Sequence, residues 1–440
     1  MADRGTNAQV GVADREAVER ALARRELSDE QATLVRGLCG SGRGIEVVKA
    51  PAGAGKTFAL DATREAWAQT GVPVVGCALS ARAAVELREQ AGIATTTIAR
   101  LKRDLERGCE LPAASVLVVD EAGMVGTRDL ALLAERAALR DTKLVLVGDD
   151  RQLPEIEAGG AFRAIGERIG ALELTEVRRQ QEAWDRTALG ALRDGSVESW
   201  ANAYADAGRL VTARTAPAVR EQLVEDWRQA HDRGQDAAMI ALRRSDVADL
   251  NERARTQMRE AGELRGEDVQ LGTRAYAEGD HVALGHNDRR LDVVNGDRGQ
   301  VIGADEHHIE VLLDRGPVVE LPALYATDGH LDHGYAITAH KAQGATFDEA
   351  FVLGSDEAYR EWGYTALSRH RESSTFYVTA PTEFLNDPSG PILGRDELVD
   401  FVARGFESER RQELAIEALQ ASVPTPPVPD VADHGFDMGM

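Results

Sequence analysis

Residues 50–57 read Ala-Pro-Ala-Gly-Ala-Gly-Lys-Thr, and this stretch decides the fold that the sequence predicts. It follows a short apolar run, Ile45–Lys49, and it opens an amphipathic segment, Thr57–Gln69. Apart from Ala50 in place of the first glycine, the stretch fits the phosphate-loop pattern that ends in Gly-Lys-Thr. Its glycines let successive backbone N–H groups turn toward phosphates, and a helix N-terminus adds positive potential. We therefore predict a phosphate-binding turn between a strand and a helix.

The alternation of strand and helix continues around this turn. Near-continuous apolar strands with helical crossovers are typical of a parallel sheet covered on both faces. The expected strands are Ile45–Lys49, Val72–Leu79, Val116–Asp120, Lys143–Gly148 and Leu172–Val177, and the helices between them include Thr57–Gln69, Ala81–Gln90 and Thr127–Leu139. A second α/β series begins after Gln180, so we predict an α/β protein with parallel sheets.

The sequence pattern in the C-terminal half changes between Gly272 and Leu321. Short strands alternate there with Gly and Asp, and Asn295-Gly296 is a strong hairpin signal, so we expect a small all-β insert. Helices and strands resume at Tyr335, and a final helix should cover about Asp396–Leu419. Residues 423–440 are rich in proline and Asp and contain no Lys or Arg, which predicts a disordered tail.

Composition narrows the class of protein. The 440 residues carry a net charge of −23, which excludes binding to nucleic acid through an overall positive field but allows a local basic groove. Only five of the 51 basic residues are lysines. The three cysteines form no C-x-x-C pair, and no apolar run approaches the roughly 20 residues of a membrane span. We expect a reduced, cytoplasmic protein without a membrane partner.

The predicted turn assigns roles to individual residues. Backbone N–H groups of Gly53, Ala54 and Gly55 should cradle phosphates, while Lys56 bridges the β- and γ-phosphates and Thr57 ligates Mg²⁺. A glycine-rich turn without a ligand is the plain structural alternative. A kinase or a GTPase would also fit this motif alone.

Two later strands end in polar residues that favour an ATPase. Asp120 can hold Mg²⁺ through its waters, and Glu121 can deprotonate an attacking water, for which a small-molecule kinase has no use. Gln152, held by Leu-Pro beyond the next strand, is well placed to sense the γ-phosphate, because ligands bind at the carboxyl ends of parallel strands.

Six motifs in order resemble those of superfamily 1 DNA helicases of the RecD-like branch, and are most similar to the helicase portion of TraA/TraI (MobF-type) conjugative relaxases. The motifs are Gly53-x-Gly55-Lys56-Thr57, Asp120-Glu121-Ala122-Gly123-Met124, Gly148-Asp149-x-x-Gln152-Leu153-Pro154, Arg178-Arg179-Gln180, Ala339-His340-Lys341-Ala342-Gln343-Gly344 and Tyr364-Thr365-Ala366-Leu367-Ser368-Arg369. The resemblance implies two RecA-like P-loop domains with an SH3-like β insert in the second. The implied division is an N-terminal helical segment 1–26, a first domain 27–180, a second domain 181–271 and 331–385, the insert 272–330, a C-terminal helix 386–422 and the tail 423–440.

The resemblance also implies further site residues, with ATP and Mg²⁺ as cofactors and single-stranded DNA as partner. Gln31 matches the glutamine that reads adenine, and Arg179 and Arg369 match the two arginines that reach the γ-phosphate from the second domain. The implied DNA contacts are Ser80, Arg82 and Thr97 in the first domain and Thr338, His340 and Lys341 in the second.

These residues favour an ATP-dependent DNA helicase that moves 5′ to 3′ on single-stranded DNA. No three-histidine cluster matches the nicking domain of relaxases, so nicking is not predicted. One alternative is a nucleotide-switched ATPase that binds a protein partner, which the acidic surface fits equally well. Another is a helicase fragment of a relaxase without unwinding activity of its own. Protein partners from conjugation, repair or phage defence all remain open.

Overall fold

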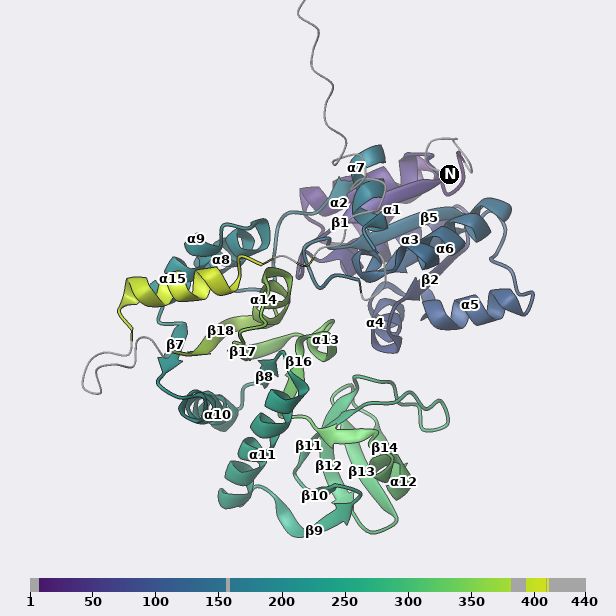
Figure 1. Ribbon diagram of the computed structural model, residues 1–440. Helices are drawn as coiled ribbons and strands as arrows, with labels where there is room; N and C mark the ends of the chain where they lie inside the picture. The colour runs from purple at the N-terminus through teal and green to yellow at the C-terminus, as the bar shows by residue number, and fades with distance from the viewer. Residues whose placement is uncertain (1–7, 156–158, 381–392, 409, 411–440) are drawn as a thin grey trace, which may run out of the picture.

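The computed structural model describes residues 8–155, 159–380, 393–408 and 410. Two parallel β-sheets, each flanked by helices, are joined to a smaller all-β region (Figure 1). The α/β class and the parallel sheets predicted from the sequence are confirmed.

The first sheet has the strand order β3-β2-β4-β5-β1-β6, and all its pairings are parallel. Alternate residues of its central strands enter two apolar clusters, one on each face, which explains their unbroken apolar sequence. The strands are β1 (Ile45–Lys49), β2 (Val74–Ala78), β3 (Ala94–Thr97), β4 (Val116–Asp120), β5 (Lys143–Gly148) and β6 (Leu172–Glu173). The helices are α1 (Arg15–Ala23), α2 (Asp29–Gly40), α3 (Lys56–Gln69), α4 (Ala81–Ala91), α5 (Ile98–Glu106), α6 (Thr127–Leu139) and α7 (Ala161–Ile169).

The second sheet has the order β16-β8-β17-β18-β7 and is also fully parallel. Two further apolar clusters cover its faces. Its strands are β7 (Leu210–Ala213), β8 (Ala237–Ala241), β16 (Ala336–Thr338), β17 (Phe347–Leu353) and β18 (His370–Thr379). The helices of this half are α8 (Ala183–Asp194), α9 (Val197–Asp206), α10 (Ala216–Asp232), α11 (Arg244–Glu260), α13 (Ala339–Ala342), α14 (Arg360–Leu367) and α15 (Arg395–Gly405).

The all-β region lies between α11 and β16 and is wider than the predicted insert, since it runs from β9 to β15. A hairpin of β9 (Arg265–Leu271) and β10 (Arg274–Glu278) precedes an antiparallel sheet of order β14-β13-β12-β11-β15. The sheet consists of β11 (His281–Leu284), β12 (Arg298–Ala304), β13 (His308–Leu313), β14 (Val318–Pro322) and β15 (Leu331–His333), with α12 (Ala323–Thr327) beside it. Its SH3-like character stays a prediction.

Three sequence predictions need correction. The strand expected at Leu172–Val177 ends at Glu173, because the chain then turns along the phosphate loop, where Arg178 N donates to Gly53 O. Asn295-Gly296 is not a two-residue hairpin loop, since it closes a longer connection in which Gly296 N donates to Leu284 O.

The third correction concerns the final helix, which ends at Gly405 rather than near Leu419. Phe406 leaves the helix and packs into the core against Trp200 and Phe376. The predictions for residues 411–422 and for the tail 423–440 lie outside the described residues.

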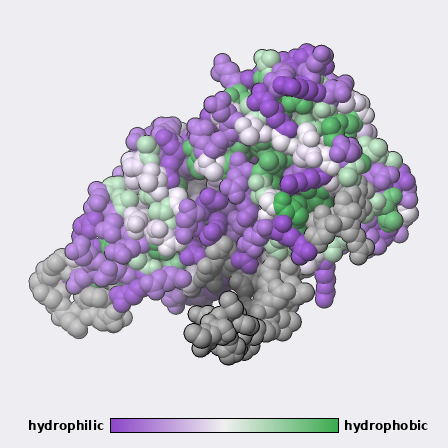
Figure 2. All heavy atoms as spheres, turned by 90° about the horizontal axis from the view of Figure 1, so that it is seen from above, coloured by the Kyte–Doolittle hydropathy of each residue, from purple (hydrophilic) through white to green (hydrophobic). Residues whose placement is uncertain are grey.

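Hydrophilic residues cover most of the face seen in Figure 2, with smaller apolar areas between them. Within the described residues, no helix combines the length and the apolar character that a membrane span requires.

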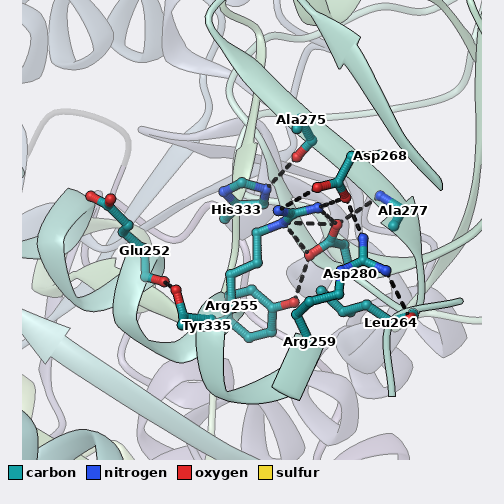
Figure 3. Close-up of polar contacts among 12 residues, drawn as sticks. Glu252, Arg255, Arg259, Leu264, Asp268, Ala275, Ala277, Asp280, His333 and Tyr335 are labelled. Carbon is teal, nitrogen blue, oxygen red and sulfur yellow. Dashed lines mark hydrogen bonds and ion pairs between the residues drawn. The ribbon is translucent and has the colours of Figure 1, made fainter. Parts of the chain in front are cut away.

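A buried carboxylate fixes the all-β region to the second sheet (Figure 3). The side chain of Asp280 has no exposed surface and accepts hydrogen bonds from Arg255 of α11 at 3.0–3.2 Å, from the Tyr335 hydroxyl at 2.7 Å and from Ala277 N at 2.7 Å. Asp268 of β9 binds the same Arg255 at 2.5 Å. The hydrogen bonds of the Asp280 carboxylate therefore hold together α11, the turn between β10 and β11, and the segment that leads into β16.

We expect the substitution Asp280→Ala to lower the free energy of unfolding by about 3–5 kcal/mol, because Arg255, the Tyr335 hydroxyl and Ala277 N all lose a buried acceptor at once. Urea denaturation measures this loss. The matched control is Asp206→Ala, whose ion pair with Arg395 is exposed, and there the loss should stay below about 1 kcal/mol. Equal losses in the two variants would contradict an anchoring role for Asp280.

Candidate functional site

The predicted phosphate loop connects β1 to the N-terminus of α3. Gly53 and Gly55 have φ angles of 82° and 76°, in the left-handed region that favours glycine. A Cβ atom at Gly53 would lie 2.5 Å from Cβ of Arg179, so a side chain at that position has no space. The strand, the turn and the helix therefore follow one another as the motif requires.

Lys56 lies between the two carboxylates at the end of β4. Its Nζ is 2.9 Å from Asp120 Oδ1 and 2.7 Å from Glu121 Oε1. Burial opposes the charged form of Lys56, but the two carboxylates outweigh it and raise its pKa above the usual range. Burial also opposes the charged form of Glu121, which by itself would raise the pKa of this carboxyl. The attraction of Lys56 outweighs burial, so the pKa of Glu121 is lowered. Glu121 is therefore ionised at neutral pH, as a general base must be.

Glu121 also has an unusual backbone conformation. Its φ of 52° is in the left-handed region, which costs a non-glycine residue about 1–3 kcal/mol. Its N–H donates to Asp120 Oδ1 at 2.9 Å. The turn is packed closely, because a Cβ at Gly123 would lie 2.7 Å from Asp149 O. The surrounding structure therefore holds Glu121 in a conformation that turns its side chain toward Lys56.

A cavity of about 310 Å³ contains most of the nucleotide-site residues predicted from the sequence. Those that line it are Gly53, Gly55, Lys56, Thr57, Asp120, Glu121, Gln152, Arg179 and Arg369. They come from the elements around the first sheet, from the segment between β6 and α8, and from the elements around the second sheet. The cavity therefore brings together residues that are more than 300 positions apart in the sequence. The lining also includes Phe58, Glu86 and Thr346, which were not singled out in the sequence analysis.

Gln31 and Ala54 are the two predicted nucleotide residues that do not line the cavity. Gln31 is buried behind the phosphate loop, where its Oε1 accepts from Ser28 N in a capping box. Its Nε2 donates to Gly55 O at 3.3 Å and to Ala54 O at 3.5 Å. In this arrangement Gln31 supports the loop from behind, and its role in reading adenine stays a prediction.

The two arginines reach the cavity from different parts of the chain. Arg369 follows α14 of the second sheet and is only 2% exposed, with Nε donating to Thr365 O. Arg179 comes from the segment beside the phosphate loop rather than from the second sheet, and its Nη1 donates to Ser368 O at 3.0 Å. Burial lowers the pKa of Arg179 to about 9, and the nearby Arg369 adds to this effect. Two neighbouring arginines, one of them with a lowered pKa, indicate a site suited to a polyanion.

The predicted DNA contacts come from elements of both halves of the molecule. The hydroxyls of Ser80, Thr97 and Thr338 each cap a helix, namely α4, α5 and α13. These helices start at the carboxyl ends of β2, β3 and β16.

The three basic residues predicted to bind DNA differ in their surroundings. His340 is exposed and Lys341 is half-buried. Arg82 is engaged elsewhere, since its Nη1 donates to Gly296 O of the all-β region at 2.6 Å. Arg82 therefore connects α4 to that region in this structure.

Two residues at the contact between the halves belong to the quoted motifs, but were assigned no role in the sequence analysis. Asp149, at the end of β5, and Tyr364, on α14, are both buried and hydrogen-bonded to each other across the two halves. A buried acid after a strand carries no local signal for a partner 215 residues away. Only the packed structure brings them together.

Comparison with known proteins agrees with this geometry. The family model described as "AAA domain" matches residues 26–215, and the "UvrD-like helicase C-terminal domain" matches residues 333–377. The chain is 40% identical over 379 residues to "Probable conjugal transfer protein TraA" of Sinorhizobium fredii, which covers 83% of this chain and 34% of that protein. It is 29% identical to the "ATP-dependent RecD2 DNA helicase" of Deinococcus radiodurans, over 80% of this chain and 49% of the relative. The chain thus spans about a third of TraA and about half of RecD2.

A solved structure shares the fold. "Crystal structure of Pif1 helicase from Bacteroides in complex with ADP-AlF3 and ssDNA" matches with a TM-score of 0.54 and 18% identity, covering 86% of this chain and 96% of that one. The first family model covers the whole first sheet and extends through α8, α9 and β7, and the second covers β16, β17 and most of β18. Together, these findings place the chain among the superfamily 1 helicases, as a relative of TraA.

Proposed function

We propose that the chain is an ATP-dependent DNA helicase that hydrolyses ATP while it moves 5′ to 3′ along single-stranded DNA. One observation carries the proposal: Lys56, Glu121 and Gln152 of the first half share a cavity with Arg369 of the second. A site completed by two halves links hydrolysis to their relative motion, which a motor requires.

The cavity residues fit ATP and Mg²⁺. Thr57 and Asp120 offer hard oxygen donors of the kind that Mg²⁺ prefers, and the ion, when bound, neutralises phosphate charge. Lys56 would exchange part of its contact with the carboxylates for phosphate oxygens. Glu121 would then accept a proton from the attacking water, which Gln152 orients. Arg179 and Arg369 would stabilise the charge that develops on the γ-phosphate.

The DNA path is proposed along the helix N-termini of α4, α5 and α13. Backbone N–H groups and capping hydroxyls contact phosphates without reading bases, as sequence-independent movement requires. The relative named as a RecD2 DNA helicase and the Pif1 structure with bound ssDNA support this partner. The direction of movement rests on the resemblance to the RecD-like branch. The similarity to TraA supports a role in conjugal transfer.

The first test measures ATP hydrolysis with and without single-stranded DNA, followed by unwinding of tailed duplexes. We expect strong stimulation by DNA, unwinding of duplexes with a 5′ tail and none with only a 3′ tail. Nucleotide-dependent binding of a protein without DNA stimulation would favour the switched ATPase instead. Unwinding from a 3′ tail alone would contradict the direction while leaving the ATPase proposal intact.

The substitution Glu121→Gln should retain ATP binding and slow hydrolysis by at least about a hundredfold, because a positioned base contributes roughly 10²–10⁴ in rate. Single-turnover hydrolysis and binding of a fluorescent ATP analogue measure the two quantities. Glu176→Gln, an exposed glutamate paired with Arg178, is the matched control and should turn over normally. A near-normal rate in Glu121→Gln would remove this residue from the base role.

The substitution Arg369→Ala should bind ATP within a few-fold of the unaltered chain but lose at least about a hundredfold in rate, since arginine fingers are worth about 10³–10⁵. Arg369→Lys should also fail, because an ammonium group does not reproduce the guanidinium fork. The control is Arg371→Ala, two residues further along the chain and within β18. The Arg371 side chain is about half exposed and pairs with Asp348. Full activity of Arg369→Lys would refute the assignment.

A further inference from the structure

One buried carboxylate outside the catalytic set is shared by both halves of the molecule. Asp149, at the end of β5, is only 4% exposed. From its own half it accepts hydrogen bonds from Arg151 N at 3.0 Å and Gln152 Nε2 at 3.2 Å. From the second half it receives the Tyr364 hydroxyl at 3.3 Å, and the Arg193 guanidinium lies 3.6 Å away. Separation of the halves would thus leave Asp149 with half of its partners.

The Tyr364 hydroxyl also reaches the phosphate loop. Burial and the nearby Asp149 raise the pKa of this hydroxyl, and the backbone of Ala52, in the phosphate loop, opposes them. The hydroxyl donates to Asp149 Oδ2 at 3.3 Å. A single atom of the second half is therefore hydrogen-bonded to the strand end that precedes Gln152 and lies near the phosphate loop. The bond to Asp149 requires α14 to be docked against the first half.

Two catalytic candidates depend on the position of this hydroxyl. Tyr364 lies on α14, and Arg369 follows the same helix with its Nε bonded to Thr365 O, so docking of Tyr364 also places Arg369. Gln152 donates to the same Asp149 Oδ2 that accepts from Tyr364. The docked hydroxyl shares the oxygen that holds the Gln152 amide, and Gln152 lines the cavity.

We propose that Tyr364 is a positioning residue that registers closure of the two halves and thereby places Arg369 and Gln152 for hydrolysis. This inference rests on the proposed ATPase function and extends it to the coupling between domain closure and chemistry. We attribute this role to the hydroxyl group, because a phenylalanine ring at position 364 would fill the same buried space as the tyrosine ring.

The test compares Tyr364→Phe with a matched control, Tyr377→Phe. Tyr377 is equally buried and donates to Asp226 Oδ2 at 2.6 Å, but it lies on the other face of the second sheet, in a separate apolar cluster. Both variants lose one tyrosine–aspartate hydrogen bond, which is buried at Tyr364 and partly buried at Tyr377. We expect Tyr364→Phe to lower kcat at least about tenfold with KM for ATP within about threefold, because small displacements of catalytic groups are costly. Tyr377→Phe should leave both constants unchanged.

Closure is measured separately by energy transfer between two labels. Cys109 is an exposed native thiol in the first half, whereas Cys39 and Cys77 are buried, and Glu225→Cys adds an exposed site on α10. ADP–aluminium fluoride should change the transfer efficiency in the labelled parent chain and in Tyr377→Phe, and change it less in Tyr364→Phe. If Tyr364→Phe matches Tyr377→Phe in kcat and in transfer, the proposal is overturned.

A double variant distinguishes action through Asp149 from general damage. If Tyr364 acts through this carboxylate, adding Tyr364→Phe to Asp149→Asn should lower kcat by less than about twofold more, since coupled residues are not additive. Full additivity would refute the coupling. A parent chain without any ATP hydrolysis would refute the proposed function, while the transfer measurement would still show whether Tyr364 governs closure.

Discussion

Charged side chains buried between the two sheets set the main constraint on this molecule. Lys56 is neutralised by two carboxylates of its own half, while Arg369 enters from the other half and the Tyr364 hydroxyl donates to the buried Asp149. Buried charges are tolerated only when they are paired and hydrogen-bonded. The relative position of the halves therefore decides whether the charges of the cleft are satisfied, and a bound polyanion changes that balance.

The first half provides a rigid frame for these charges. The strands that lead to the phosphate loop and to Asp120 are buried on both faces, so their carboxyl ends have little freedom to move. The left-handed conformation of Glu121 and the close approach of Gly123 to Asp149 add a strained turn between two such strands. Strain of this kind persists only where the surrounding packing over-determines it.

The all-β region is fixed at one side and contacted at the other. Asp280 anchors it to α11 and to Tyr335, close to the strand that leads to Thr338 and His340. On the opposite side, Arg82 of α4 donates to Gly296. Arg82 and Thr338 both belong to the proposed DNA path, so movement of the all-β region would shift residues of that path in both halves.

The sequence by itself determined the local parts of this protein. The phosphate loop, the Asp120-Glu121 pair and the order of strands and helices follow from side-chain periodicity and from glycine, which act over a few residues. The limits of short or exposed elements, such as β6 and the end of α15, depended on packing and were predicted less well. Only the tertiary structure decided which distant groups meet: Arg179 against Gly53, Tyr364 on Asp149, and Arg82 on Gly296. The physical reason is that these contacts come from the docking of whole sheets, and no local propensity encodes a partner about 130 to more than 210 residues away.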